Sequence, residues 1–363
     1  MPTYIHDIAI SVPGKSIDQD FQKKIIKEAL GKDRMTQAIL HRIYSQSGIE
    51  KRHTVVKEFH NPEVVNPYLT GTPESTPSTA ERNEIYKKEA SSLFVETGKK
   101  LLDNNPHITK DDITHVVTVS CTGFYAPGPD YDLVKQLGLK ISVQRYHLGF
   151  MGCFAAFPAL KMAHSFCENN PDAVVLVVAT ELCSLHFQNK TELDNLISAS
   201  VFADGSAGAI VSQKEPPKKS YEMNGFASSI TPNGEKDMAW DIGNNGFEMV
   251  LSTYVPDIIE ANVGDVLTPL FNEYSLKHDD IDYWAVHPGG RAIVDKIESS
   301  LNLEKHQIAA SRKTLSEYGN MSSVTILFVL HALLSSNPEK GSKVLPITFG
   351  PGLTIESGIL TVH

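Results

Sequence analysis

The sequence has few of the residues that hold metals or cross-link secreted proteins. Its 363 residues include four cysteines, and no CxxC or HExxH spacing is present. Such spacings are typical of zinc sites and metalloproteases, so we expect no metal. So few cysteines are more typical of free thiols in a reducing compartment than of disulfides. The four are Cys121, Cys153, Cys167 and Cys183.

Long hydrophobic runs and clusters of basic residues are also missing. No uncharged apolar stretch reaches the roughly 18 residues of a membrane-spanning helix, and the start, MPTYIHDIAISVPGK, does not resemble a signal peptide. The 33 Lys and Arg residues are scattered among 43 Asp and Glu residues, giving a formal net charge of −10. Nucleic acids and anionic membranes bind clustered positive charge, so we expect neither partner. The expectation is a cytoplasmic globular protein.

Two halves of the chain follow the same order of secondary-structure elements. Residues 115–120 and 283–286 are short and apolar on both faces, which predicts two buried strands. Each half continues to a glycine turn and a long helix, which starts near Cys153 in the first half and near Met321 in the second. A proline follows each helix, as is common where helices stop, and then a second apolar strand. These prolines and strands are Pro171 with 173–179 and Pro338 with 344–348.

The duplication predicts a layered α/β fold. A strand–helix–strand unit that occurs twice implies two mixed sheets, with helices packed between and outside them. We divide the chain into an N-terminal half, residues 1–214, and a C-terminal half, residues 215–363. A pseudo-twofold axis between the halves brings the starts of the two central helices together. Cys153, His287 and Asn320 are therefore expected to converge on one site.

Cys153 is the residue best suited to catalysis. It lies in the motif GCFA at 152–155, at a glycine turn just before a helix. Free backbone N–H groups and the helix dipole favour the thiolate there, with cysteine pKa values of roughly 3.5–7.5. The alternative is a cysteine that packs as a small hydrophobe. Likewise, His287 alone is compatible with a structural histidine, and Asn320 alone with a helix N-cap.

Four motifs together resemble those of a known family. In order they are GCFA at 152–155, HPGG at 287–290, YGNMSS at 318–323 and FGPGLTIE at 349–356. Over nearly its whole length the chain resembles the type III polyketide synthases, the chalcone synthase-like branch of the thiolase superfamily. The resemblance implies a duplicated, thiolase-like, five-layered αβαβα fold and a homodimer. It also implies an acyltransferase that takes acyl-CoA and malonyl-CoA directly, without a carrier protein, a metal or a redox cofactor.

Cys153, His287 and Asn320 match the catalytic residues of this family. The resemblance makes Cys153 the nucleophile that carries the acyl starter as a thioester. His287 stabilises the thiolate as an ion pair and, with Asn320, donates hydrogen bonds to the thioester oxygen of malonyl-CoA. An enolate develops there on loss of CO2, and each such donor is worth roughly 2.7–4 kcal/mol. The enolate attacks the acyl group, the cycle repeats, and the chain cyclises to a small aromatic or pyrone product.

The resemblance also implies residues around the cavity. Phe202 matches the phenylalanine where the CoA tunnel meets the cavity. Met249 stands where plant chalcone synthases have a second phenylalanine, so we expect a differently shaped gate, with plain core packing as the alternative. Ser322, in the YGNMSS motif, is also predicted to bind substrate.

The CoA phosphates are expected at the N-terminal basic region. Arg42 and the segment 49–52 match the part of the family sequence whose basic residues meet these phosphates. A solvated basic surface is the alternative, because two further basic positions of the family are uncharged here, at Ile39 and Gln46.

Three residues favour a small cavity. Cys121 and Cys183 occupy positions where plant enzymes have threonines, and bacterial synthases that make tetrahydroxynaphthalene have cysteines at both. His186 is bulkier than the plant threonine and is expected to narrow the pocket. We therefore predict a bacterial-type enzyme that makes small aromatic rings, unless the cysteines only pack. Ala126 replaces a methionine that reaches across the plant dimer, so the partner's contribution to the cavity stays open.

Three other functions are compatible with parts of this pattern. A ketoacyl-acyl carrier protein synthase III-like enzyme uses the same residue types for a single condensation, but YGNMSS and the GPG loop at 350–352 favour the polyketide synthase. A papain-like hydrolase also has Cys, His and Asn in this order. The duplication and the sequence around Cys153 disfavour it. A non-catalytic binding protein on the same fold is the third alternative.

Overall fold

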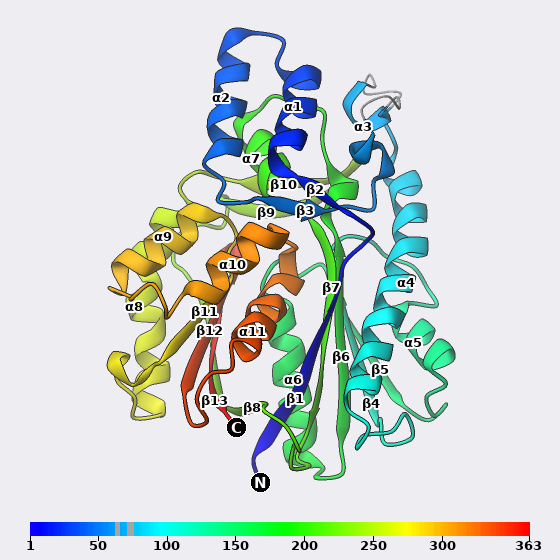
Figure 1. The fold of residues 1–363 in the computed structure, drawn as a ribbon, viewed down its shortest axis with the longest axis vertical. Coiled ribbons are helices and arrows are strands. Elements are labelled where there is room, and N and C mark those ends of the chain that lie inside the picture. The colour runs from blue at the N-terminus through cyan, green and yellow to red at the C-terminus, as the bar shows by residue number, and fades with distance from the viewer. Residues whose placement is uncertain (62–65, 71–75) are drawn as a thin grey trace.

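In residues 1–61, 66–70 and 76–363, which the computed structural model describes, nine strands form one mixed β-sheet (Figure 1). Their order is β11-β12-β13-β8-β1-β7-β6-β4-β5. The parallel pairs are β4 with β5, β4 with β6, and β11 with β12. The strands are β1 (Thr3–Ser11), β4 (His115–Ser120), β5 (Gln144–Gly149), β6 (Val174–Leu182), β7 (Asp204–Ser212), β8 (Tyr221–Ile230), β11 (Tyr283–Val286), β12 (Lys343–Gly350) and β13 (Thr354–Val362).

The sheet has two halves that meet at β1 and β8. Three residue pairs join these strands, from Thr3↔Met223 to Ile5↔Tyr221. Strands in a sheet twist relative to one another, and two half-sheets that diverge can share a short ladder at one end. The sequence predicted two mixed sheets. The structure has the two expected halves, but this ladder connects them.

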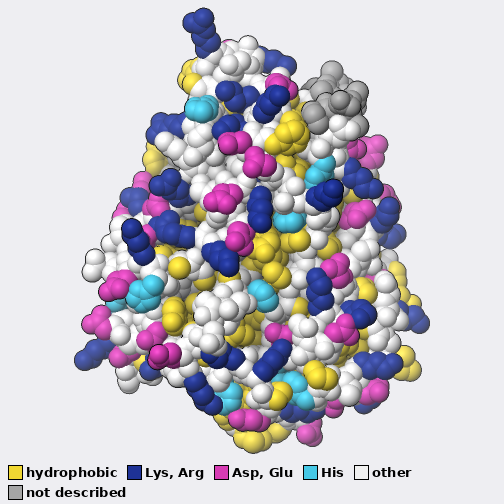
Figure 2. Space-filling model, in the orientation of Figure 1, with side chains coloured by type: hydrophobic (Ala, Val, Ile, Leu, Met, Phe, Trp, Pro, Cys, Tyr) yellow, Lys and Arg dark blue, Asp and Glu magenta, His cyan; other side chains and the backbone are white. Residues whose placement is uncertain are grey.

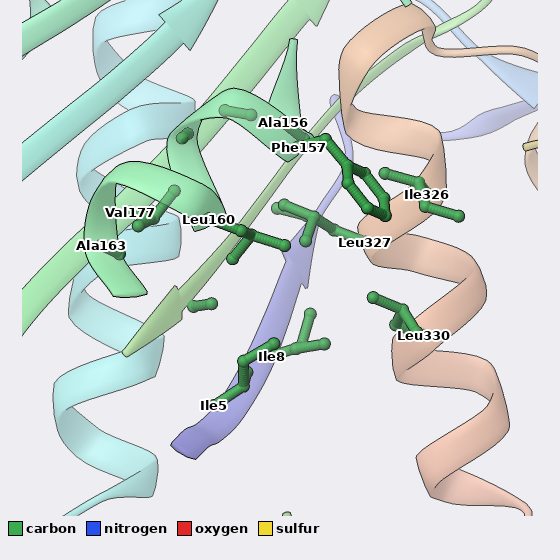
Figure 3. Close-up of a cluster of buried hydrophobic side chains, with 14 of the residues drawn as sticks. Ile5, Ile8, Ala156, Phe157, Leu160, Ala163, Val177, Ile326, Leu327 and Leu330 are labelled. Atoms are coloured by element: carbon green, nitrogen blue, oxygen red, sulfur yellow. The ribbon is translucent and has the colours of Figure 1, made fainter. Parts of the chain in front are cut away.

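Two helices, α6 (Ala156–Asn169) and α11 (Thr325–Ser335), lie between the half-sheets (Figure 1). Phe157 and Leu160 of α6 share one buried cluster with Leu327 and Leu330 of α11 (Figure 3). Ile8 of β1 belongs to the same cluster. The apolar runs that begin after the two glycine turns therefore build the central layer of the protein.

The outer helices complete the layers. Side chains alternate along a strand, so Val175 and Val177 of β6 face the central cluster, whereas Leu176 packs with the outer helices α4 and α5. Helices α8 and α9 cover the other half-sheet in the same way. The bounds are α4 (Thr79–Asn104), α5 (Pro129–Leu137), α8 (Val255–Glu273) and α9 (Arg291–Ser300).

The remaining elements cluster mainly at one end of the protein, at the top of Figure 1. Two small antiparallel sheets lie there with helices α1, α2 and α7: the pair β2–β3, which is separated in sequence by α1 and α2, and the hairpin β9–β10. The bounds of these and the other elements are β2 (Ser16–Asp18), α1 (Gln19–Leu30), α2 (Arg34–Ser45), β3 (Lys51–His53), α3 (Pro67–Thr70), α7 (Leu193–Val201), β9 (Met238–Gly243), β10 (Gly246–Leu251) and α10 (Ala309–Tyr318). Five 3₁₀ turns in the described residues are Lys57–His60, Cys183–His186, His278–Asp280, Ser322–Val324 and Pro351–Leu353.

The surface carries both signs of charge. On the face in Figure 2, basic and acidic side chains are interspersed. Among the described residues, the structure contains no helix whose length and apolar character are sufficient to cross a membrane.

Candidate active site

The ends of four strands place side chains around one cavity. Cys121 and Cys183 follow β4 and β6, which are parallel neighbours. His287 and Pro351 follow β11 and β12, which are also parallel. The carboxyl ends of parallel neighbouring strands lie side by side, so the residues that follow them are brought together in each pair. All four residues line one cavity, together with Cys153.

Cys153 lies in a tight turn immediately before α6. Gly152 has φ +87°, and a Cβ added there would lie 2.3 Å from Cδ of Pro351, so this position requires glycine. The backbone N–H of Gly152 donates to the Cys121 sulfur at 3.0 Å, and the N–H of Ala155 donates to the Gly152 carbonyl at 3.1 Å. These contacts hold the Cys153 thiol at the cavity wall. The side chain is 6% exposed.

His287 is buried at the end of β11. Its backbone N–H donates to the carbonyl of Ile347 at 2.9 Å, which extends the parallel ladder by one residue. Among the residues that the structure describes, neither ring nitrogen of His287 has a hydrogen-bond partner. Buried polar atoms are usually paired, and unpaired ones are common at functional sites. The ring is therefore available to a ligand in the cavity.

Asn320 is fixed by both its side chain and its backbone. Its Nδ2 donates to the carbonyl of Gly289 at 3.0 Å, and its Oδ1 accepts from the N–H of Ser322 at 2.8 Å. Its backbone N–H donates to the Val201 carbonyl, and its own carbonyl accepts from the N–H of Ala203, both at 2.8 Å. The Asn320 amide thus has a defined orientation at the cavity, with one Nδ2 hydrogen left for a ligand.

Burial controls the charges of the catalytic candidates. It raises the pKa of the Cys153 thiol to about 12, and a hydrogen bond from Ser322 only partly opposes this. Burial also lowers the pKa of His287 to about 3. At neutral pH the structure therefore contains a neutral thiol and a neutral imidazole. This differs from the ion pair predicted from the sequence, because both groups are removed from water and do not bond to each other.

A two-stranded hairpin forms one wall of the cavity. Met238 and Trp240 of β9 line it with Met249 and Leu251 of β10. The register pairs Met249 with Trp240 and Leu251 with Met238, so these four side chains share one face of the hairpin. Trp240 also donates from Nε1 to the carbonyl of Cys121 at 2.9 Å. The wall is thereby attached to the end of β4.

Comparison with protein families assigns nearly the whole chain. The model of the N-terminal domain of chalcone and stilbene synthases matches residues 2–216, and that of the C-terminal domain matches residues 222–362. The chain belongs to the chalcone and stilbene synthase family. The resemblance inferred from the four motifs is confirmed, whereas the bacterial type stays a prediction.

Two solved structures have the same fold as this chain. PKS-I from the brown alga Ectocarpus siliculosus has 28% sequence identity and a TM-score of 0.92, with 100% of this chain and 98% of that chain covered. The C-terminal type III polyketide synthase domain of Steely1, a type I/III hybrid from Dictyostelium, has 29% identity and a TM-score of 0.89, with 100% and 99% covered. The predicted thiolase-like fold class is confirmed.

Most of the predicted site residues of this chalcone synthase-family chain lie together. Cys153, His287 and Asn320 line the same cavity, although they come from three distant segments. The residues predicted to bind substrate that share this lining are Phe202, Met249, Cys121, Cys183 and Ser322. Their functional roles stay predictions, as does the division at residue 214.

His186 lies outside this cavity. The strand-like segment predicted for 179–187 ends at Leu182 and continues as a 3₁₀ turn, which carries His186 into an adjoining pocket. Its Nδ1 accepts from the N–H of Phe247 at 3.0 Å, so its Nε2 carries the proton and donates to the Thr122 carbonyl at 2.7 Å. The ring stacks on Phe247 with centroids 4.1 Å apart. Burial lowers the pKa of His186 to about 3, which keeps the ring neutral.

The basic region predicted to meet CoA phosphates has two different environments. Arg42 is exposed on α2, and its Nε donates to Oε1 of Gln46 at 3.5 Å. Arg52 is 3% exposed, and its guanidinium donates to groups within the protein. Phosphate binding by the region therefore stays a prediction for Arg42, and Arg52 is unsuited to it.

Sequence reasoning did not identify Glu181 as a site residue. Its buried carboxylate accepts from the N–H of Cys121 at 2.9 Å, from the hydroxyl of Thr122 at 2.9 Å and from the hydroxyl of Ser323 at 2.5 Å. It thereby connects the end of β4 with the segment after Asn320. Burial raises the pKa of this carboxyl, whereas the hydrogen bonds lower it. A carboxylate inside the apolar run VVLVVATEL was the available signal.

No group of three or more His, Cys, Asp or Glu side chains in the described residues is arranged to hold a metal ion. The four cysteines are free thiols and all are buried.

Proposed function

We propose that this protein is a carrier-protein-independent acyltransferase that extends a Cys153-bound acyl starter by repeated decarboxylative condensation with malonyl-CoA. The proposal rests on one observation: Cys153, His287 and Asn320 line a single, largely apolar cavity. The fold and family are those of type III polyketide synthases. Acyl-CoA and malonyl-CoA are the proposed substrates, and the proposed mechanism needs no metal or redox cofactor.

Loading begins with transfer of the thiol proton. The neutral ring of His287, with both nitrogens free, is suited to accept the proton of Cys153 as the sulfur attacks the acyl-CoA carbonyl. The new bond joins Cys153 sulfur to the acyl carbon, and the CoA thiolate leaves and takes up a proton. A thioester keeps the acyl group activated for the next step.

Extension requires a stabilised enolate. Loss of CO2 from malonyl-CoA leaves an electron pair that is delocalised onto the thioester oxygen. The free Nδ2 hydrogen of Asn320 and an N–H of His287 are the proposed donors to this oxygen. The enolate carbon then attacks the acyl carbonyl on Cys153 and displaces the sulfur. Apolar residues such as Phe202 and Leu251 keep water from the enolate.

The lining of the cavity supports a compact product. Most of the lining side chains are apolar, and the thiols of Cys121 and Cys183 contribute little polarity. We therefore propose that cyclisation gives a small aromatic or pyrone product. A homodimer in the cytoplasm completes the proposal. The exposed edge strand β5 is available for a contact between subunits.

Incubation with radiolabelled malonyl-CoA, with and without a panel of acyl-CoA starters, tests this function. The expected result is release of labelled CO2 and labelled products whose masses differ by two-carbon units. Cys153→Ala should abolish condensation, whereas Cys167→Ala, which changes a buried cysteine on the far part of α6, should retain it. Absence of any product from all starters, with folded protein, would contradict the proposal.

A further inference from the structure

Arg52 of β3 is a buried cation that binds backbone carbonyl groups. Its Nη1 donates to the carbonyls of Ala199 at 2.9 Å and Phe202 at 2.6 Å, and its Nη2 donates to Oε1 of Gln22. The guanidinium carbon lies 5.9 Å from the ring centroid of Tyr44. Two guanidinium nitrogens thus donate to three acceptors, whereas the ammonium group of lysine has a single nitrogen. Arg52 thus fixes the backbone at the end of α7.

The same backbone segment holds Asn320. Val201 and Ala203 form the two hydrogen bonds to the Asn320 backbone, each at 2.8 Å. Phe202, between them, lines the cavity, and its carbonyl is bound by Arg52. Residues 199–203 therefore lie between the guanidinium on one side and Asn320 on the other. Any shift of this segment moves Phe202 and Asn320 together.

Close packing and a second hydrogen bond reinforce this arrangement. A Cβ added at Gly319, which has φ +72°, would lie 2.9 Å from both Arg52 Cδ and the Val201 carbonyl oxygen. Asp204, the residue after Ala203, accepts from the N–H of Val55 at 2.8 Å. Segments 52–55 and 199–204 are therefore connected in both directions. The turn that carries Cys153 is held by other contacts: the hydrogen bond from Gly152 to the Cys121 sulfur and the packing of Gly152 against Pro351.

We propose that Arg52 is a positioning residue that sets the Asn320 amide and the Phe202 ring for enolate formation, and that it acts through residues 199–203. The role in enolate formation rests on the proposed function. The contacts that link Arg52 to Asn320 through residues 199–203 rest on geometry alone. Loss of the guanidinium should therefore affect decarboxylation more than acylation of Cys153.

Arg52→Met removes the donors and keeps most of the side-chain volume. Arg82→Met is the matched control. Arg82 is also a buried arginine that donates to backbone carbonyls, those of Pro77, Leu185 and Phe187, but it does not bond to residues 199–203. Two activities are measured on each variant, at a temperature well below its Tm. The first is CO2 release from malonyl-CoA. The second is acylation of Cys153 by an acyl-CoA, which is monitored by intact-protein mass spectrometry. For Arg52→Met, decarboxylation should fall at least tenfold more than acylation. For Arg82→Met, their ratio should stay that of the wild type.

Hydrogen exchange provides a readout that does not depend on catalysis. Peptides that cover 199–204 and 318–323 should lose protection in Arg52→Met, because they contain the amides that link Ala203 and Asn320. They should keep it in Arg82→Met. An unchanged activity ratio with unchanged protection would overturn the proposal, as would equal effects of both substitutions.

Two further outcomes are separable. If the wild-type protein releases no CO2 from malonyl-CoA, the proposed function fails, and hydrogen exchange alone then decides whether Arg52 holds Asn320. If Arg52→Met does not fold, Arg52→Lys keeps the charge and a donor, and the same ratio and the same peptides are compared. A wild-type ratio and wild-type protection in Arg52→Lys would count against the need for two donor nitrogens at this position.

Discussion

The sulfur of Cys121 accepts a hydrogen bond at 3.0 Å from the backbone N–H of Gly152, the residue that precedes Cys153. A thiol from the end of β4 thus supports the turn that presents another thiol. The S–H of Cys121 also points to the Gly152 carbonyl, with a sulfur–oxygen distance of 3.6 Å. The Cys121 side chain therefore contacts both backbone polar groups of Gly152.

Cys121→Ala should loosen this turn. The change leaves the buried N–H of Gly152 without an acceptor, which costs about 1–3 kcal/mol of stability. The free energy of unfolding and the rate of Cys153 acylation should both fall. Cys167→Ala is the control, since the Cys167 sulfur has only long contacts to carbonyls, at 3.7 Å, and lies away from the turn. Equal acylation rates in both variants would mean that Cys121 does not support the nucleophile.

Asn320→Ala should separate decarboxylation from nucleophile reactivity. Removal of an oxyanion donor typically costs about 10²–10³ in rate, so CO2 release should fall by that order while iodoacetamide still alkylates Cys153. Asn105→Ala is the control, because Asn105 is fully buried and bonded, at 2.7 Å to the Leu101 carbonyl, but is remote from the cavity. Parallel loss of both reactivities in Asn320→Ala would indicate a purely structural amide.

The alkylation of Cys153 in the unliganded protein should increase steadily with pH. Its pKa is raised by burial to about 12, so the thiolate fraction grows roughly tenfold per pH unit between pH 7 and 10. A plateau from neutral pH upward would indicate the ion pair with His287 instead. The raised pKa also means that Cys153 contributes stability below the unfolded value near 8.5, which is lost as the pH rises towards 12. The rate of Cys153 alkylation is measured by peptide mass spectrometry at a series of pH values.

His186→Ala should change both stability and products. The N–H of Phe247 and the carbonyl of Thr122 lose their partners, and the stacked ring is removed, so stability should fall by about 2–5 kcal/mol. The adjoining pocket would then be larger where Cys183 separates it from the main cavity, which favours longer products. Product masses over several starters measure this. Replacement of His115, buried against Phe166 and outside both pockets, is the control.

The sequence predicts well what depends on local pattern. The continuous apolar runs at 115–120 and 283–286 coincide with β4 and β11, because fully buried strands need no alternation. The duplication correctly indicates that Cys153, His287 and Asn320 converge, since equivalent helices start at the centre of the fold.

Contacts between distant segments were not predictable in this way. Arg52 follows a lysine in a polar segment, and its burial depends on carbonyls of residues 199 and 202. His186 was assigned to the cavity, but the hydrogen bonds from Phe247 and to Thr122 hold its ring elsewhere. The predicted ion pair of Cys153 is absent from the described structure because desolvation, which depends on the complete fold, outweighs the local effect of a helix start.

The hairpin β9–β10 has a consequence for how such enzymes diverge. It supplies four cavity side chains, yet it forms its own two-stranded sheet outside the nine-stranded one in the described structure. An isolated two-stranded ribbon is marginally stable, and this one depends on contacts such as those of Trp240 and Phe247 with the loops beneath it. Substitutions on the face of the hairpin that lines the cavity can therefore alter the shape of the cavity without repacking the central helices. Exchange of residues 238–251 between relatives offers a direct route to new products.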